Sequence, residues 1–431
     1  MILKLRNRIG LAAVLVLFKS GAMAVAQDTA AAKAQDDSNT NAMTGKTTFN
    51  LLQMGPLTLH PRVSVGLTGD DNILFSKTLK ESDLYWSIQP GLQGVIGDDA
   101  ALIAMRDQQG DVLNLTPGGI IVQPPAFWPG KLLMLDYSPR FKFYDRYSAL
   151  NAIDQFATLN LLWPMNQLVL GFRQDYQLQK ATIIEANQFA TTETIATALS
   201  AAYQFGDKTS VEGNFRRASI GYDVSNLIGY TEYNTEDWLN YDLTESMPVS
   251  VGVLAGYDNV AFHQSQTFEQ LRARVRYNYT EKLVFDASGG GELREYESGQ
   301  SGTFSPVFSL SGSYWPAART SVNLTASRQQ NASILNGYNY TSTGVSLGLT
   351  QGITDRFTAG VNIGYNSLDY TPVTAGPAKY TDAYYTARVN FDAKILQHLT
   401  GGVFYQMTTL QSANSGNIKQ NQVGVKMTFS Y

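Results

Sequence analysis

The chain has 431 residues, with 32 Lys and Arg against 36 Asp and Glu, which gives a formal net charge of -4 at pH 7. It contains no cysteine, so a lipoprotein anchor, disulfides and thiolate metal sites are excluded. The slightly acidic balance gives no reason to expect nucleic acid as a partner. Many Tyr, Phe and Gly residues with only 16% charged residues are typical of strands that show one face to lipid and the other to water.

Residues 1–26 are predicted to be a cleaved secretory signal. Basic residues precede a short apolar run over residues 9–18, and the small residues Ala24 and Ala26 complete the pattern of a cleavage site. Neither this run nor any later segment has the roughly 20 consecutive apolar residues of a transmembrane helix. Residues 27–48 contain almost no large apolar side chains, and residues 27–54 are predicted to be a disordered periplasmic lead.

Residues 55–431 are predicted to be a β-barrel, which opens with two strands. Residues 62–68 form the first, which runs into Asp70-Asp71-Asn72, and residues 83–94 return as the second. The two stretches read GPLTLHPRVSVGLTGDDNILFS and SDLYWSIQPGLQG. They resemble the opening of the beta-barrel porin 2 family, with its first strand, Asp-Asp-Asn turn and Ser-Asp to Pro-Gly return strand. The resemblance implies an outer-membrane barrel associated with exopolysaccharide synthesis and export.

The regular succession of strands and turns is interrupted over residues 97–130. Asp98 and Asp99 are suited to capping a short helix, and four prolines follow, which prevent a regular ladder. Counting strands from a periplasmic N-terminus places this insertion on the periplasmic side. Two interpretations remain open: a plug or docking element for a periplasmic partner, or an ordered loop packed under the barrel.

From Lys131 onward, short polar turns alternate with longer loops rich in Gly, Asn and Ser. Short turns are predicted at residues 164–166, 206–208, 244–246, 280–282, 316–318, 353–355 and 397–399. Longer loops are predicted at residues 180–189, 223–229, 262–267, 297–302, 330–337, 369–379 and 411–417. This asymmetry is typical of an outer-membrane barrel with its long loops outside. The count predicts an all-β, antiparallel, up-and-down transmembrane barrel of about 18 strands, with 16 as the alternative.

Alternation within the strands predicts which side chains face the lumen. Arg272, Arg274 and Arg276 alternate with apolar residues, and lipid does not tolerate three guanidinium groups, so the arginines are predicted to point inward. By the same reasoning, the candidate pore-lining residues are Arg140, Lys142, Arg173, Arg272, Arg274, Arg276, Arg388 and Lys394, with Arg216, Arg294 and Lys426 as further inward bases. The expected inward acids are Asp175, Glu212, Asp258, Asp286, Glu292 and Asp392. Trp163, Phe205, Tyr314 and Trp315 lie beside short turns and are predicted to form the periplasmic aromatic girdle.

This excess of inward bases has two interpretations. One is a lumen that favours anions or acidic sugars, since Arg and Lys set that preference in pores. The other is that the bases pair with acids on neighbouring strands and line a wet wall.

The last eleven residues, NQVGVKMTFSY, form a strand with one apolar face and an aromatic C-terminus. This strand resembles the closing strand of bacterial outer-membrane barrels. The resemblance implies that Phe429 and Tyr431 form the insertion signal read by the barrel-assembly machinery.

Other candidate sites are sparse. His263 with Ser265 and Asp258 is the one arrangement that an outer-membrane hydrolase could use, because a base must reach a nucleophile. Asp70-Asp71-Asn72 offers oxygen ligands for Ca²⁺, but an Asx-turn is the simpler interpretation. Residues 289–291 are three consecutive glycines without a following helix, so a bulge or kink is expected rather than a phosphate loop.

The sequence therefore predicts a non-enzymatic, porin-like conduit in the cell outer membrane, with no cofactor and no metal. Its cargo is expected to be a polysaccharide or a small anionic solute, and the link to exopolysaccharide comes from the resemblance. Outer-membrane lipid and the barrel-assembly machinery are the expected partners, and a homotrimer is a further option. The alternatives are a non-conducting scaffold barrel that docks a periplasmic partner and, more remotely, an outer-membrane hydrolase.

Overall fold

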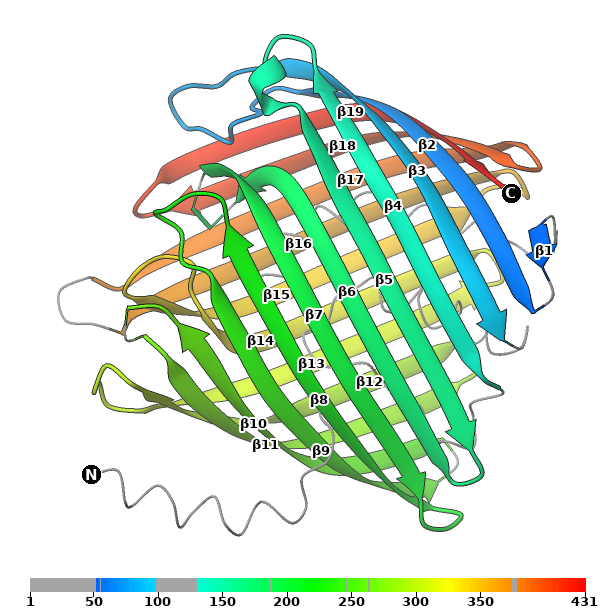
Figure 1. The fold of residues 1–431 in the computed structure, drawn as a ribbon, viewed down its shortest axis with the longest axis vertical. Helices are drawn as coiled ribbons and strands as arrows, with labels where there is room; N and C mark the ends of the chain where they lie inside the picture. The colour runs from blue at the N-terminus through cyan, green and yellow to red at the C-terminus, as the bar shows by residue number, and fades with distance from the viewer. Residues whose placement is uncertain are drawn as a thin grey trace.

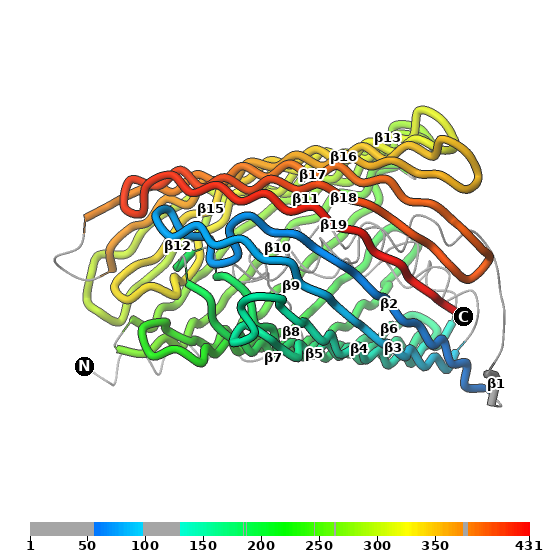
Figure 2. The backbone as a smooth tube through the Cα atoms, turned by 90° about the horizontal axis from the view of Figure 1, so that it is seen from above, coloured from blue at the N-terminus to red at the C-terminus, as the bar shows by residue number. Residues whose placement is uncertain are grey.

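The computed structural model describes residues 52–54, 56–97, 130–183, 185–186, 188–244, 246–262, 264–373 and 378–431. These residues form one closed antiparallel sheet in which each strand from β2 to β19 pairs with its neighbours in sequence. The last strand, β19, pairs with β2 and closes the ring, from Gln422 opposite Asp70 to Ser430 opposite Arg62. Figures 1 and 2 show this closure where the red β19 runs beside the blue β2. The ring has 18 strands, so the predicted fold class and strand number are confirmed.

The strand bounds follow the chain in order. They are β1 Leu52–Met54, β2 Leu57–Asp70, β3 Asp83–Gly97, β4 Leu132–Tyr144, β5 Ala152–Met165, β6 Leu168–Ile183, β7 Gln188–Gln204, β8 Thr209–Tyr222, β9 Tyr230–Thr244, β10 Met247–Val260, β11 Gln266–Thr280, β12 Leu283–Tyr296, β13 Thr303–Ala317, β14 Thr320–Ala332, β15 Tyr338–Gly352, β16 Phe357–Pro372, β17 Tyr380–Leu396, β18 Leu399–Ser412 and β19 Gly416–Ser430. A single 3-10 turn, Ser148–Leu150, lies between β4 and β5.

The predicted short turns are confirmed, but several predicted loops are shorter in the structure. The loop expected at residues 411–417 is reduced to residues 413–415, and β19 begins at Gly416, whose φ of +77° suits a glycine at the turn. Strands of 13 to 17 residues exceed the roughly 9–11 that cross a membrane. The strands are therefore long enough to extend beyond the membrane while the hydrogen-bond ladder continues.

Two further expectations differ from the structure. The lead was predicted to be disordered through residue 54, but Leu52–Met54 form β1, which pairs with β2. Gly289–Gly291 form no bulge, because they pair in continuous register with Leu271–Ala273 on β11. A Cβ added at Gly290 would lie 1.9 Å from the Leu271 carbonyl oxygen, so close backbone approach is the reason for glycine there. The predicted signal and residues 98–129 lie outside the described residues.

The outer surface of the barrel is apolar. Along β11, Leu271 is 64% exposed whereas Phe268, on the opposite alternation, is 6% exposed. Trp163, Phe205 and Tyr314 of the predicted girdle are exposed, but Trp315 is half-buried, because neighbouring residues of a strand point to opposite faces. A closed sheet with this outer band and a polar interior is the architecture of an outer-membrane barrel. No helix among the described residues is long and apolar enough to cross a membrane.

Candidate functional site

The inner wall of the barrel carries the candidate site, and contacts that skip strands identify it. Arg274 on β11 reaches Glu212 on β8 at 3.1 Å, past two intervening strands. Arg272 on β11 reaches Glu236 on β9 at 3.3 Å, past β10. Side chains can meet in this way only on the concave side of the sheet, so both arginines lie inside the barrel.

Six of the eight predicted pore-lining residues form ion pairs. The pairs are Arg140–Asp154 at 2.9 Å, Lys142–Asp154 at 3.0 Å, Arg173–Asp175 at 2.6 Å, Arg272–Glu236 at 3.3 Å, Arg274–Glu212 at 3.1 Å and Arg276–Asp286 at 3.6 Å. The structure therefore contains the pairing that the sequence left as one of two interpretations. Because the pairing neutralises much of the basic wall, any preference for anions is weaker than the count of inward bases indicates.

The other two predicted residues come from β17. Arg388 donates to Gln406 Oε1 at 3.4 Å, and its guanidinium lies 4.4 Å from the ring centre of Phe404. Lys394 is half-buried and makes no ion pair within the described strands. The structure does not bring these two residues together with the arginines of β11.

The solvent-exposed fraction of the inward side chains changes along β11. Gln266, near the long-loop end, is 1% exposed. The exposed fraction of the side chain then rises from 10% at Arg272 to 25% at Arg274 and 34% at Arg276, beside the short turn. The inner side chains of β11 are therefore more exposed near the short turn than near the long-loop end. The exposure differs on β4, where Leu132 and Met134 at the short-turn end are 0% and 2% exposed and pack with Val95.

The hairpin of β14 and β15 causes much of this packing. Pairing between β13 and β14 stops at Phe308 opposite Arg328, whereas β14 and β15 remain paired up to Ala332 opposite Asn339. The end of the hairpin therefore separates from β13 and extends into the lumen, while β15 stays paired with β16 up to Tyr338 opposite Pro372. Its tip, residues 333–337, reaches the opposite wall, where the Ile228 amide donates to the Ile334 carbonyl at 2.9 Å. In Figure 2 this yellow hairpin lies between the two walls.

A second loop also packs inward, between β2 and β3. Phe75 is 1% exposed and has a φ of +47°, a strained conformation for a residue other than glycine. It packs with Tyr340, Tyr370 and Leu410 in an apolar cluster on the inner side of β15 to β19. The Ile73 carbonyl accepts from the Thr182 hydroxyl at 3.2 Å, so the loop also contacts β6.

Leu335 joins this cluster to a second one. Ile334 packs with Ile183, Ile220, Leu227 and other residues from the opposite wall, and Leu335 contacts both clusters. The hairpin tip therefore forms an apolar bridge across the long-loop end of the lumen. Phe75 and the hairpin tip were not recognised in the sequence, because nothing local marks an apolar loop residue as inward-facing.

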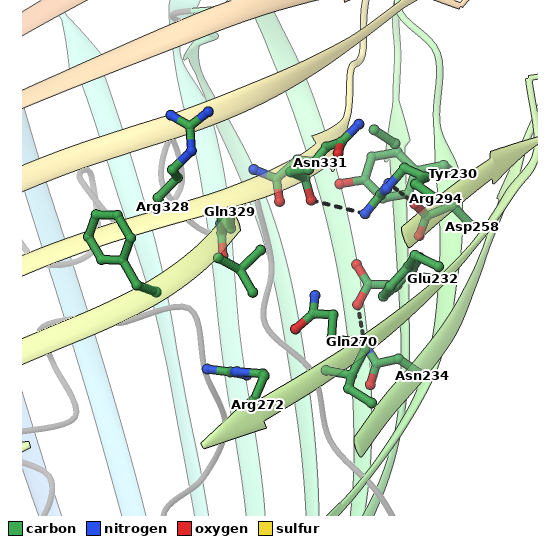
Figure 3. Close-up of a pocket in the computed structure, with 16 residues that line it drawn as sticks. Tyr230, Glu232, Asn234, Asp258, Gln270, Arg272, Arg294, Arg328, Gln329 and Asn331 are labelled. Atoms are coloured by element: carbon green, nitrogen blue, oxygen red, sulfur yellow. Dashed lines mark hydrogen bonds and ion pairs between the residues drawn. The ribbon is translucent and has the colours of Figure 1, made fainter. Parts of the chain in front are cut away.

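A polar pocket lies between the bent hairpin and the wall. It is lined by residues from β9 to β14, among them Glu232, Asn234, Asp258, Arg294 and Asn331 (Figure 3). Arg294, 2% exposed, donates to Asp258 at 3.0 Å and to Glu292 at 2.7 Å, and it also donates to the Gln330 carbonyl at 3.0 Å. The sequence had placed Arg294, Asp258 and Glu292 inward but had not placed them together. Glu232, Asn234 and Glu236 occupy every second position of β9. This alternation was the sequence signal that could have identified the rest of the pocket.

The other candidate sites are explained by local contacts. The Asn72 amide donates to Asp70 Oδ1 at 2.8 Å, which is the Asx-turn, and Asp70 Oδ2 also accepts from Gln420 and Gln422 on β19. Asp70 therefore ties the two ends of the barrel sheet together. Among the described residues no group of three or more His, Asp or Glu is placed to hold a metal ion.

Two of the three residues named for the hydrolase alternative make other contacts. Ser265 bonds to the Val260 backbone, and Asp258 pairs with Arg294. His263 lies outside the described part of the chain. His398 packs its ring on Tyr431, with 4.7 Å between ring centres.

No protein-family model and no curated protein matches the chain. Its fold is similar to solved structures of outer-membrane proteins. OccAB4 of Acinetobacter baumannii has a TM-score of 0.44 at 10% identity, covering 86% of this chain and 98% of that one. OccK3 (OpdO) of Pseudomonas aeruginosa has a TM-score of 0.42 at 10% identity, with 86% and 95% covered. OpdK of Pseudomonas aeruginosa, solved with vanillate, has a TM-score of 0.43 at 8% identity, with 86% and 99% covered.

At these values the similarity transfers neither a substrate nor a role. The structure of the chain itself gives the location: a closed barrel with an apolar outer band and ion-paired side chains inside. The protein is a closed 18-strand β-barrel of the outer membrane.

Proposed function

We propose that the protein is a passive conduit across the outer membrane, narrowed at its long-loop end by the β14–β15 hairpin. The observation that carries this proposal is the rising exposure of inner side chains from Gln266 to Arg276 along β11. Along β11 the inner side chains near the short turn are partly exposed, and at the long-loop end contacts made by the loops cover the inner face. An 18-strand ring is wide enough to leave an aqueous channel unless something folds inside it.

Passage through this conduit depends on size and only weakly on charge. The apolar bridge of Ile334 and Leu335 sets the narrowest point, because a solute has to pass between it and the wall. The ion pairs of the inner wall leave a modest basic excess for selecting among solutes.

The test is single-channel conductance of the refolded chain from Gln27 onward in a planar bilayer. A variant in which an Asn-Gly turn replaces residues 333–338 removes the bridge and joins the paired residues Ala332 and Asn339 by a two-residue hairpin connection. The expected result is a small conductance for the original chain and a severalfold larger one for the variant. If circular dichroism shows both barrels folded and neither conducts, the conduit is wrong and the scaffold alternative takes its place.

The resemblance of residues 55–76 and 82–94 supports a cargo connected with exopolysaccharide secretion. Residues 97–130 are proposed to act on the periplasmic side, either as a plug or as a docking element. Deleting them should abolish binding of a periplasmic partner in the docking case and raise the conductance in the plug case. Trimer formation stays a prediction, and cross-linking of the refolded protein in lipid tests it.

A further inference from the structure

The apolar outer band is interrupted on one flank of the barrel, over β6 to β9. Val253 of β10 is 51% exposed on the outer face, and Asp237 of β9 lies directly opposite it in the ladder. The chain neighbours of Asp237, Glu236 and Trp238, are each 4% exposed on the inner side, so Asp237 points outward. A carboxylate therefore lies in a part of the surface where the neighbouring strand presents valine to lipid.

The depth of Asp237 in the membrane follows from two tyrosines of the same strand. Tyr233 and Tyr241 are 36% and 46% exposed on the outer face, and Asp237 lies midway between them. Exposed tyrosines are typical of the two membrane–water interfaces. The eight residues from one ring to the other correspond to roughly 20 Å along the membrane normal at a tilt of about 40°, which is close to the band of about 25 Å in such barrels. Asp237 is therefore near the middle of the band, where lipid solvates a charge worst.

Further polar side chains share this outer face. The Thr197 hydroxyl of β7 donates to Gln174 Oε1 of β6 at 2.7 Å. The same cross-strand row continues to Arg217 of β8 and Tyr233 of β9. Arg217 points outward, because its neighbour Ala218 is 1% exposed on the inner side. Its guanidinium lies 5.9 Å from the ring centre of Tyr233, and it makes no ion pair with any residue that the structure describes.

The opposite flank carries an apolar row instead. Phe391, Val403 and Val425 are 41%, 50% and 49% exposed in one row across β17 to β19. In Figure 2, β17 and β18 lie across the barrel from β7 and β8. Acyl chains suffice to cover such a row, but they offer neither a counter-charge nor a hydrogen bond to Arg217 and Asp237.

The flank also permits close approach of another wall. The row of Asp237 continues through Gly213 of β8 and Ala201 of β7, which have small side chains or none. Small residues on a membrane-facing surface let two backbones come near each other, which strengthens packing in lipid. Charge and shape on this flank therefore both favour a protein neighbour over lipid.

We propose that the outer face of β6 to β9 is the contact surface for a second copy of this chain, in a two-fold dimer. A two-fold contact uses the same patch on both sides, so it needs a patch that complements itself. Arg217 and Asp237 supply a base and an acid on one patch. An axis along the membrane normal between them brings each arginine to the side of the interface that holds the aspartate of the other copy.

The same charges disfavour a ring of three. In a ring each subunit sets one flank against a different flank of its neighbour. Arg217 and Asp237 would then face an apolar row such as that of Val403. A dimer, and not the trimer that the sequence left as an option, is therefore the expected assembly. The proposal rests on the outer-membrane location and does not depend on conduction.

The experiment uses the absence of cysteine from the chain, because a single introduced thiol then reports one contact. Thr235→Cys places the thiol between Arg217 and Asp237, since Thr235 pairs with Phe215. Val403→Cys, on the far flank, is the matched control. The refolded mature chain from Gln27 is treated in dilute lipid vesicles with a short bifunctional maleimide and separated on a denaturing gel. Light scattering in detergent measures the mass of the unmodified assembly, and heat-dependent gel migration shows that each variant is folded.

The expected results are a mass of two chains and a dimer yield roughly tenfold higher for Thr235→Cys than for the control. Arg217→Asp, added to Thr235→Cys, should reduce the yield to that of the control, because two acids then face two acids. Further addition of Asp237→Arg exchanges the two charges and should restore the yield.

A mass of one or three chains would overturn the two-fold contact. So would equal yields at the two thiol positions, a yield that Arg217→Asp leaves unchanged, or a folded charge-exchange variant whose yield stays low. A dimer that does not conduct would support the contact and refute the conduit.

Discussion

At the scale of single residues, burial decides how much an ion pair matters. Arg294 is 2% exposed and is the shared partner of Asp258 and Glu292, whereas the side chains of Arg276 and Asp286 are about a third exposed to the lumen. A buried pair that loses one member leaves the other charge without water or a counter-charge. A pair in contact with water loses little, because the solvent replaces the partner.

Arg294→Ala is therefore expected to lower the free energy of unfolding by about 3–5 kcal/mol. Arg276→Ala, the matched control on the same inner wall, is expected to cost less than about 1 kcal/mol. Urea titration of the refolded barrels in lipid, followed by tryptophan fluorescence, measures both changes. Equal losses in the two variants would contradict the role assigned to burial.

At the scale of elements, the last strand combines a structural and an assembly role. β19 closes the ring against β2. Its end is held by His398, whose ring packs on Tyr431 and whose Nδ1 donates to the Ser430 carbonyl oxygen at 3.1 Å. The resemblance to closing strands predicts that Phe429 and Tyr431 are also read by the barrel-assembly machinery. Loss of the stacking contact and loss of the recognition signal are therefore separable effects.

Tyr431→Ala is expected to slow barrel assembly severalfold in the presence of the assembly machinery, measured as the appearance of heat-resistant folded protein. His398→Ala removes the same stacking contact but leaves the C-terminal aromatic in place, so assembly should proceed at the original rate. Equal slowing in both variants would show that packing, and not recognition, is what Tyr431 supplies.

The β14–β15 hairpin is the element that gives the lumen its asymmetry. It leaves the wall because its tip gains apolar contacts on the opposite side, around Ile334 and Leu335, that the solvent at the barrel rim could not provide. The same bend creates the polar pocket behind it. One departure from the regular ladder thus positions both the proposed constriction and the pocket.

At the scale of the whole molecule, acids and bases across the inner wall determine the field that a solute meets. Glu212 and Glu236 hold Arg274 and Arg272, and both acids are buried behind the arginines they pair with. The electric field inside the lumen is therefore set by the net charge that remains after acids and bases have paired, and not by the number of arginines.

Changing both Glu212→Gln and Glu236→Gln removes two negative charges while keeping the shapes of the side chains. At position 212 one of the two acceptor oxygens, which accept from Asn240 and Arg274, becomes an amide donor. The reversal potential in a salt gradient is expected to shift toward anion permeation, because two arginines lose their counter-charges. Glu269→Gln, on the exposed outer face of β11, provides the control and should leave the reversal potential unchanged. An unchanged potential in the double variant would show that ions do not pass along this wall.

The sequence by itself predicted the strands, the faces of most of their residues and a number of about 18, with 16 as the alternative. Alternation along a strand and the residue types of short turns are local properties, so Arg272, Arg274 and Arg276 could be assigned to the inner face without a structure. Only the tertiary structure decided which acid meets which base, where the ladder of β13 and β14 stops, and where Phe75 and Leu335 pack. Those outcomes depend on contacts between distant parts of the chain across the lumen, and no pattern within a single strand encodes them.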